Sequence, residues 1–236
     1  GVQTCALPIY YISQCIYYLE NTDADNVGGP TVAKAKNLMQ EIVSVAYHSR
    51  FALGGGRCHE ENYEGYADTV AFGAFKKETL IEVGLYDEKF TRNQDDELNF
   101  RLIESGKKIF ITPKIKFYYY PRDKYSKLFS QYYQYGWWKV EVLRKHGKPA
   151  RLTHLIPGLF VTFVTLGLPL AMLNQIFLYF YSSVLSLYFL ILMGVTFSTQ
   201  KLKKIKNKIR LAYVIFILHI SYGLGFIAGS LKILKR

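Results

Sequence analysis

The sequence lacks charged side chains over a long internal stretch. Residues 155–200 include no Asp, Glu, Lys or Arg, and none of the 18 carboxylates of the chain follows Glu141. The hydrophobic content of 50% is therefore divided unevenly along the 236 residues. This division excludes a single uniform globular domain and predicts two parts joined near residue 150: a domain over residues 10–150 and an apolar region over residues 151–236.

Cysteine is also scarce. The three cysteines, Cys5, Cys15 and Cys58, have neither the spacing of a metal site nor the even number of a disulfide set, so a reducing compartment is expected. Residues 1–9 have no initiating Met, no basic region and no full apolar signal segment, so we do not expect them to be a secretory signal. Residues 1–9 read GVQTCALPI and resemble the translation of a common sequencing adapter. We expect them to be adapter-derived, with the reading frame truncated before Tyr10; the alternative is a real amino-terminal strand or a short signal-like segment.

Positive charge is in excess, with a formal net charge of +12, but its placement is uneven. Nine of the 30 Lys and Arg residues follow residue 154, where no carboxylate balances them. Most of the excess therefore sits between and beside apolar segments, which favours contact with anionic membrane lipid over a DNA-binding surface. We expect membrane lipid as a partner and no nucleic acid.

Three apolar stretches, residues 155–173, 176–197 and 211–231, are each long enough to cross a hydrocarbon core of ~30 Å as a helix. The uncharged hinge at Asn174 and Gln175 makes the first two a hairpin. Basic residues precede this hairpin and fill the connection after it, at residues 144–151 and 201–210. The positive-inside rule then predicts a multi-pass cell-membrane protein whose preceding domain is cytoplasmic. The alternative, a buried core hairpin, would need a larger soluble part to cover it.

Residues 10–150 alternate predicted helices and strands. The apolar spacing predicts helices over residues 11–19, 31–51, 77–83 and 95–104, and strands beginning at Val27 and spanning residues 69–75, 108–111 and 115–120. Alternation of this kind indicates an α/β layer, here too small to be a complete doubly wound domain.

Three motifs within this layer carry a family resemblance: DTVAFGAF at residues 68–75, VGLYD at 83–87 and QDDELNFRL at 94–102. Together they resemble the acceptor half of family-2 glycosyltransferases, and especially the membrane-anchored branch that includes the succinoglycan-biosynthesis glycosyltransferases. That family shows a small-residue strand, a helix, a V-G-x-[FY]-D turn and E-D-x-[ED]-L-x-x-R at a helix start. The resemblance implies an α/β fold, part of a Rossmann-like GT-A nucleotide-diphospho-sugar transferase domain, followed by an all-α transmembrane region of three helices.

By this resemblance Asp95 is the general base of an inverting transfer. The reaction needs a group that takes the proton of the acceptor hydroxyl as it attacks the anomeric carbon, and a carboxylate at a helix start can do so. Gln94 replaces the usual Glu, which casts doubt on any role that needs a second charge there. Glu97 and Arg101 are spaced for an i,i+4 ion pair that would orient Asp95. The alternative is an acidic first turn favoured by the helix dipole alone.

Asp68 is expected to contact either the acceptor or the donor, with a strand-edge Asp as the alternative. Gly73 and Ala74 would let the acceptor approach the backbone, with close packing as the alternative. Gln131 and Trp137 occupy the place of the Q-x-x-R-W motif of the family, but the R-W spacing is missing, which argues against a processive synthase. Trp137 and the tyrosines near it would form either a stacking platform for sugar or the interfacial face of an amphipathic helix.

The metal motif of the family is not expected in this chain. Asp23 and Asp25 have the D-x-D form that holds a divalent cation and the nucleotide diphosphate, but they follow a predicted helix instead of ending a strand. The resemblance implies Mg or Mn in a full-length parent, with its ligands upstream of Tyr10 and none in the present residues. Three basic side chains would either meet phosphate or be solvated: Lys34, Lys36 and Arg57.

The third apolar stretch carries polar and small residues at His219, Tyr222, Gly223 and Gly225. A histidine inside a membrane segment is a functional candidate, and helix packing through the glycines is the alternative.

These patterns together predict an inverting glycosyltransferase of the hexosyltransferase type, acting in polysaccharide or exopolysaccharide biosynthesis. It would move a sugar from a nucleotide-sugar to a lipid-linked or polysaccharide acceptor at the cytoplasmic membrane face. A non-enzymatic membrane-anchored binding module and a catalytically inactive fragment are the alternatives.

Overall fold

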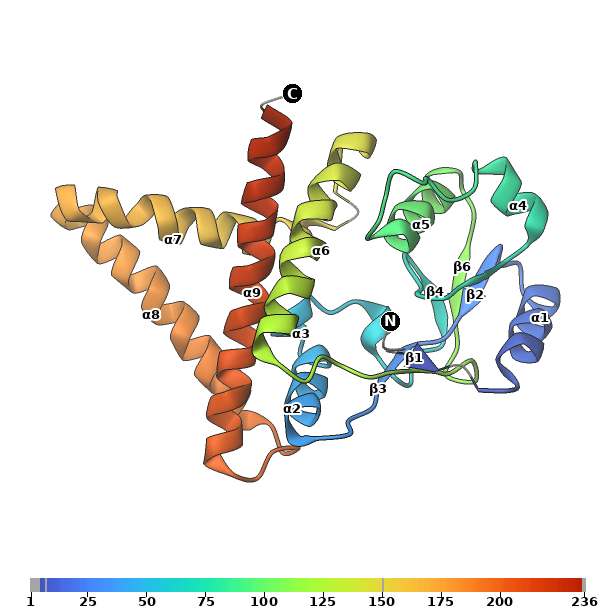
Figure 1. Cartoon of the computed structure of the whole chain (residues 1–236), viewed down its shortest axis with the longest axis horizontal. Helices are drawn as coiled ribbons and strands as arrows, with labels where there is room; N and C mark the ends of the chain where they lie inside the picture. Colours follow the sequence, from blue (N-terminus) through green and yellow to red (C-terminus); the bar gives the residue numbers. More distant parts are fainter. Residues whose placement is uncertain (1–4, 7, 150, 235–236) are drawn as a thin grey trace. The chain divides into compact units, whose positions relative to one another are not determined.

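A computed structural model describes residues 5–6, 8–149 and 151–234 (Figure 1). The chain forms two compact units, Gly1–Lys36 with Gly55–Pro121, and Asn37–Gly54 with Arg122–Arg236. The first unit is α/β and the second is helical. The predicted fold class, a partial α/β domain followed by three long apolar helices, is confirmed.

Two small mixed sheets form the framework of the first unit. Parallel strands β2 (Asn26–Gly28) and β6 (Ile109–Ile111) are flanked by the antiparallel strands β5 (Ala74–Phe75) and β4 (Gly65–Ala67), in the order β4-β6-β2-β5. In the second sheet, β7 (Phe117–Tyr119) pairs in parallel with β3 (Thr31–Ala33) and antiparallel with β1 (Cys5–Ala6). Three helices, α1 (Tyr11–Asn21), α4 (Lys77–Glu82) and α5 (Gln94–Glu104), and a 3-10 turn at Arg57–His59 complete this unit.

The four-stranded sheet β4-β6-β2-β5 is covered by helices on both faces. Ile109 and Ile111 of β6 pack with Leu98 and Leu102 of α5 in one buried cluster. Phe110, which points to the opposite face, stacks on Tyr18 of α1 with ring centroids 5.7 Å apart. This alternation is the period-2 pattern of a strand buried on both sides, and it fixes α5 against the sheet.

The predicted helix over residues 31–51 is wrong in its first part. Residues Thr31–Ala33 form β3, because the β-branched Thr31 and Val32 suit a strand beside β7. Helix α2 (Leu38–Tyr47) begins only after Asn37, whose side chain accepts a hydrogen bond from the backbone N–H of Gln40 at 3.0 Å. Helix α3 (Arg50–Leu53) follows as a separate turn.

The predicted strand over residues 69–75 is also shorter than expected. Only Ala74 and Phe75 pair in the sheet, and Phe72 has a positive φ of 54°. Side chains replace strand partners here: Tyr11 donates a hydrogen bond to the carbonyl of Phe72, and Asn99 donates to the carbonyl of Val70 at 2.8 Å. The segment is therefore a turn that side chains hold against the sheet.

The second unit is built around α9 (Ile205–Leu234). Its other helices are α2, α3, α6 (Tyr125–His146), α7 (Ile156–Leu173) and α8 (Gln175–Ser198), with a 3-10 turn at Leu152–His154. The structure thus groups α2, α3 and α6 with the apolar helices. Residue 150 lies outside the described residues, and the predicted division into residues 10–150 and 151–236 remains a prediction.

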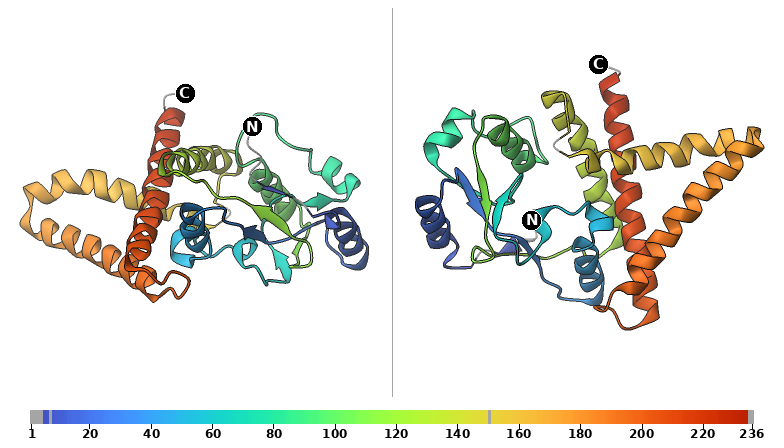
Figure 2. Two further views of the ribbon diagram at one scale, coloured as in Figure 1. Left: turned by 60° about the horizontal axis from the view of Figure 1, so that its bottom comes forward. Right: turned by 180° about the vertical axis from the view of Figure 1, so that it is seen from behind.

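Helices α6 and α9 pack against each other, as Figure 1 and the right view of Figure 2 show. Their backbones are close enough that a Cβ atom on Gly136 would lie 2.0 Å from the carbonyl oxygen of Tyr222, and one on Gly225 would lie 1.9 Å from that of Tyr133. Gly223 packs in the same way against Pro157 and Val161 of α7. The glycines of the third apolar stretch therefore serve helix packing.

Helices α7 and α8 form the predicted hairpin. Asn174 ends α7, and its side chain accepts the backbone N–H of Phe177 at 3.0 Å, which caps α8. Three helices of the described residues, α7, α8 and α9, are long and apolar enough to span a membrane. In the apolar part of each helix, 22% of the residues of α7 and 11% of those of α8 are buried, compared with 50% of those of α9. The hairpin therefore exposes most of its apolar surface within the described residues.

The amino terminus contributes one short strand. Cys5 and Ala6 pair with Tyr119 and Tyr118 of β7, while residues 1–4 and 7 lie outside the described residues. The adapter origin of residues 1–9 remains a prediction. Burial raises the pKa of the Cys15 thiol to about 11, so this cysteine is a packing residue and not a reactive thiol.

Candidate active site

The candidate site lies at the start of α5 in the first unit. Asn93 precedes the helix in the left-handed region with φ 58°, and Asp95 is exposed on the first turn. The Oδ1 atom of Asp95 accepts the backbone N–H of Asp96 at 3.1 Å. The carboxylate therefore stands at the positive end of the helix dipole with its surface open to a ligand.

Glu97 lies one turn deeper and is almost fully buried, with 1% of its side chain exposed. Arg101 holds it through two hydrogen bonds, Nε to Oε1 at 2.9 Å and Nη2 to Oε2 at 2.8 Å. This geometry is the bidentate ion pair expected from the i,i+4 spacing. Because both groups are largely removed from water, the pair fixes the first turns of α5 in one arrangement.

Arg101 also binds the VGLYD turn. Its guanidinium donates hydrogen bonds to the carbonyl of Val83 and, at 2.6 Å, to that of Leu85. Gly84 and Leu85 both have positive φ, 88° and 60°, which turns these carbonyls toward the arginine. One side chain therefore joins two of the three motifs.

The same turn brings Tyr86 close to Asp95. Burial raises the pKa of the Tyr86 hydroxyl, and the negative charge of Asp95 raises it further. A phenol kept protonated beside a carboxylate can donate a hydrogen bond to that carboxylate or to a bound sugar hydroxyl.

Asn99 joins the third motif to the helix. Its amide donates to Thr69 Oγ1 at 3.0 Å and to the Val70 carbonyl at 2.8 Å, and its oxygen accepts from Asn26 Nδ2 at 2.9 Å. A Cβ atom on Gly73 would lie 2.1 Å from Asn26 Oδ1, so close packing alone requires glycine at this position. The role of Gly73 and Ala74 toward an acceptor remains a prediction.

The predicted residues fall into two groups. Gln94, Asp95, Glu97 and Arg101 share α5, and Asp68, Gly73 and Ala74 belong to the segment that Asn99 holds in the same unit. Gln131 and Trp137 lie on α6 in the other unit.

On α6, both predicted residues already make contacts within their own unit. Gln131 accepts a hydrogen bond from Arg122 at 3.3 Å and donates one to Tyr135 at 2.9 Å. The ammonium of Lys232 lies 4.6 Å from the centre of the Trp137 ring. A sugar stacked on that face would therefore replace a cation–π contact.

The D-x-D pair does not fit a divalent cation. Asp25 accepts hydrogen bonds from Thr79 Oγ1 at 3.1 Å and from the Lys108 N–H at 2.9 Å, while Asp23 binds Tyr66 and the Lys108 ammonium. The bond from Lys108 holds the pKa of Asp23 below its usual range. Both carboxylates thus tie the start of β2 to its neighbours, and no cluster of three or more metal-ligating side chains occurs among the described residues.

The three basic candidates for phosphate contact are engaged with aromatic residues. The ammonium groups of Lys34 and Lys36 lie 4.1 Å and 4.4 Å from the ring centres of Tyr118 and Tyr120. Arg57 donates hydrogen bonds at 2.7 Å to the Tyr63 hydroxyl and to the Tyr66 carbonyl. These contacts agree with a structural role for the three side chains, and their contact with phosphate remains a prediction.

His219 is held inside the second unit by two hydrogen bonds. Its Nε2 donates to the carbonyl of Phe51 at 3.0 Å, so the ring is the tautomer whose Nδ1 accepts the Tyr188 hydroxyl, also at 3.0 Å. The histidine thus links α3, α8 and α9, and helix packing explains its presence.

Sequence reasoning assigned no role to Tyr86, Asn99 or Asn26. A signal existed for Asn99, an amide one turn after Asp95 beside the buried Leu98, because a polar side chain on a buried helix face needs partners. No comparable signal marks Asn26, whose partner is 73 residues away in the chain.

The chain resembles family-2 glycosyltransferases of the succinoglycan-biosynthesis type, as the motifs predict, and two glycosyltransferases align with it. The succinoglycan biosynthesis protein ExoA of Rhizobium meliloti (strain 1021) is 31% identical over 153 residues, which cover 65% of this chain and 46% of ExoA. The dolichyl N-acetyl-alpha-D-glucosaminyl phosphate 3-beta-D-2,3-diacetamido-2,3-dideoxy-beta-D-glucuronosyltransferase of Methanococcus voltae is 33% identical over 121 residues, 50% of this chain and 37% of that enzyme. The matched region thus spans less than half the length of either relative. No protein-family model matches the chain.

Proposed function

We propose that this chain forms the acceptor side of an inverting, membrane-bound glycosyltransferase of the GT-A type. The observation that carries the proposal is the exposed Asp95 at the start of α5, held in place by the buried Glu97–Arg101 pair. Similarity to two glycosyltransferases supports it, and their names, which refer to succinoglycan biosynthesis and to a dolichyl phosphate-linked sugar, favour a polysaccharide or lipid-linked acceptor.

In this mechanism Asp95 takes the proton of the acceptor hydroxyl. The freed oxygen attacks the anomeric carbon of a nucleotide-sugar, the bond to the nucleoside diphosphate breaks on the opposite face, and the configuration is inverted. Tyr86 would donate a hydrogen bond to the acceptor beside the base. A divalent cation such as Mg²⁺ or Mn²⁺ would neutralise the leaving diphosphate, but the described residues do not form its site, so we assign no step to it.

A transfer assay tests the proposal directly. Membranes that contain the protein should move label from a nucleotide-sugar to the lipid or polysaccharide fraction, and the new linkage should have the anomeric configuration opposite to that of the donor. A product with the configuration of the donor would contradict inversion, and failure with every common nucleotide-sugar would contradict the transferase.

We further propose a multi-pass membrane protein whose first unit is cytoplasmic, supported by the exposed apolar hairpin and by the basic connection between α8 and α9. A green fluorescent protein fused after Lys206 should therefore fluoresce, while alkaline phosphatase at the same place should be inactive, because the phosphatase matures only outside the cytoplasm. The opposite pair of results would reverse the orientation.

A further inference from the structure

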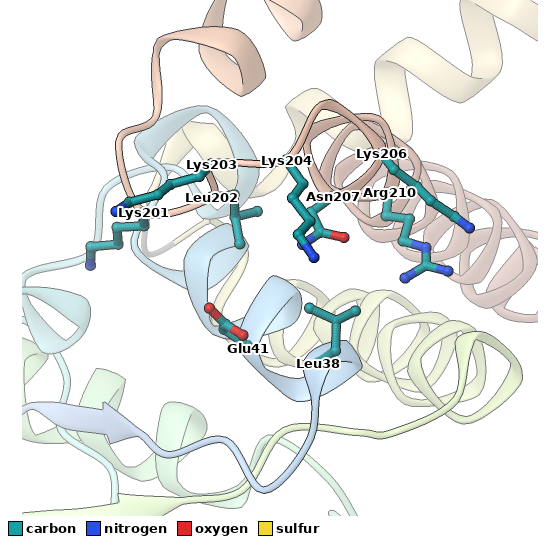
Figure 3. A pocket seen from close by; sticks show the side chains of 9 residues that line it. All are labelled: Leu38, Glu41, Lys201, Leu202, Lys203, Lys204, Lys206, Asn207 and Arg210. Carbon is teal, nitrogen blue, oxygen red and sulfur yellow. The ribbon is translucent and has the colours of Figure 1, made fainter.

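A basic cavity of about 500 Å³ lies in the second unit, between the connection that joins α8 to α9 and the start of α2 (Figure 3). Five cations line it, together with one carboxylate: Lys201, Lys203, Lys204, Lys206, Arg210 and Glu41. In Figure 3 the side chain of Lys204, just before α9, points toward α2, which carries Leu38 and Glu41. The volume is in the range of about 300–1,000 Å³ typical of small-molecule sites.

The connection is anchored and is more than a loose run of charge. Leu202 is 2% exposed, and the first turn of α9 is closed by hydrogen bonds from the N–H groups of Asn207 and Lys208 to the Lys204 carbonyl. The buried Leu202 and these hydrogen bonds therefore fix the backbone that carries the neighbouring lysines.

The cavity cations have no anionic partner within the described residues, 8–149 and 151–234. Lys208, near the start of α9, does not line the cavity and donates a hydrogen bond to the Phe197 carbonyl at 2.6 Å. Five positive charges facing one carboxylate leave a strong local excess, and the amino-terminal end of the 30-residue helix α9 adds to it. Such a site favours a ligand with more than one negative charge.

The position of the cavity indicates where this ligand comes from. The connection joins the carboxyl end of α8 to the start of α9, two helices long and apolar enough to span a membrane. A ligand at this end of both helices meets the cavity at the level of lipid head groups, where basic pockets beside membrane helices bind polyanionic lipids.

We infer that this cavity binds the head group of a membrane lipid that carries two phosphate groups. The lysines and Arg210 contact the phosphate oxygens, and the carboxylate of Glu41 weakens binding by repelling them. The inference rests on the proposed membrane location and is independent of the transferase activity, because binding is measured without a donor sugar.

A binding titration tests this site. The purified full chain in a neutral detergent is titrated with fluorescent cardiolipin, and the dissociation constant is measured. The double variant Lys203→Gln/Lys206→Gln should bind about 10–30-fold more weakly, since each lysine contributes about fivefold to binding of anionic lipid. Glu41→Gln should bind several-fold more tightly, because it removes the one negative charge of the cavity. The matched control Lys77→Gln/Lys89→Gln removes the same charge from two exposed lysines of the first unit and should stay within about twofold.

Three results would overturn the inference. An equal loss in the matched control would make the effect one of net charge. Phosphatidylglycerol that binds as tightly as cardiolipin at equal total charge would exclude a two-phosphate site. Displacement of the lipid by inorganic pyrophosphate at equimolar concentration would show that a soluble phosphate is the ligand. Unchanged far-ultraviolet circular dichroism of the variants guards against unfolding.

Discussion

Replacing Asp95 with Asn should lower sugar transfer by about 10²–10⁴-fold, the usual contribution of a general base. The amide keeps the shape of the side chain, and its oxygen can still accept the backbone N–H of Asp96, so the start of α5 should form as before. Binding of the nucleotide-sugar, measured by calorimetry on the same active preparation, should be nearly unchanged. The loss should appear in kcat.

Asp96→Asn is the matched control, because it removes the same charge from the next residue. Its effect on transfer should be far smaller, since it points elsewhere on the helix. If both variants lose transfer equally, or if Asp95→Asn lowers the unfolding midpoint, the acidic run serves the helix dipole and Asp95 is not the base.

Arg101→Met should destabilise the first unit by about 3–5 kcal/mol, the usual cost of leaving one partner of a buried ion pair uncompensated. The substitution keeps most of the side-chain volume but leaves the buried carboxylate of Glu97 without its guanidinium and removes the donor for the carbonyls of Val83 and Leu85. Chemical denaturation followed by circular dichroism measures the change.

Two comparisons separate this loss from an effect of charge alone. Glu97→Gln/Arg101→Met removes both charges and should recover part of the stability, because no ion is left buried. Lys107→Met breaks the exposed pair with Glu82 and should leave the unfolding midpoint nearly unchanged. Equal midpoints for Arg101→Met and Lys107→Met would contradict the structural role of the arginine.

The local sequence pattern predicts the helices and strands of this fold well where the apolar residues of a segment are the ones that become buried. Helices α1, α4 and α5 and strands β6 and β7 lie where apolar spacing and glycine place them, and α7 to α9 follow from uninterrupted apolar length. It fails at Thr31–Ala33 and at residues 69–73. In the first case a strand partner more than 80 residues away decides the conformation, and in the second the Asn99 side chain does.

The site shows the same limit. Spacing alone predicts the Glu97–Arg101 pair, because residues four apart meet on a helix. That Arg101 also binds two carbonyls of the VGLYD turn depends on the positive φ of Gly84 and Leu85, which no local pattern indicates for a leucine. Tertiary contacts of this kind turn three separate motifs into one arrangement.

The close contact of α6 with α9 has a consequence for biosynthesis. At a ribosomal rate of about 5–20 residues per second, the roughly 90 residues between Gly136 and Gly225 take about 5–20 s to synthesise. During this interval α6 leaves the ribosome before its glycine-lined partner exists, and the apolar hairpin of α7 and α8 is synthesised between them. Assembly of the helical unit must therefore wait until α9 has been synthesised, and until then α6 needs protection from premature contacts.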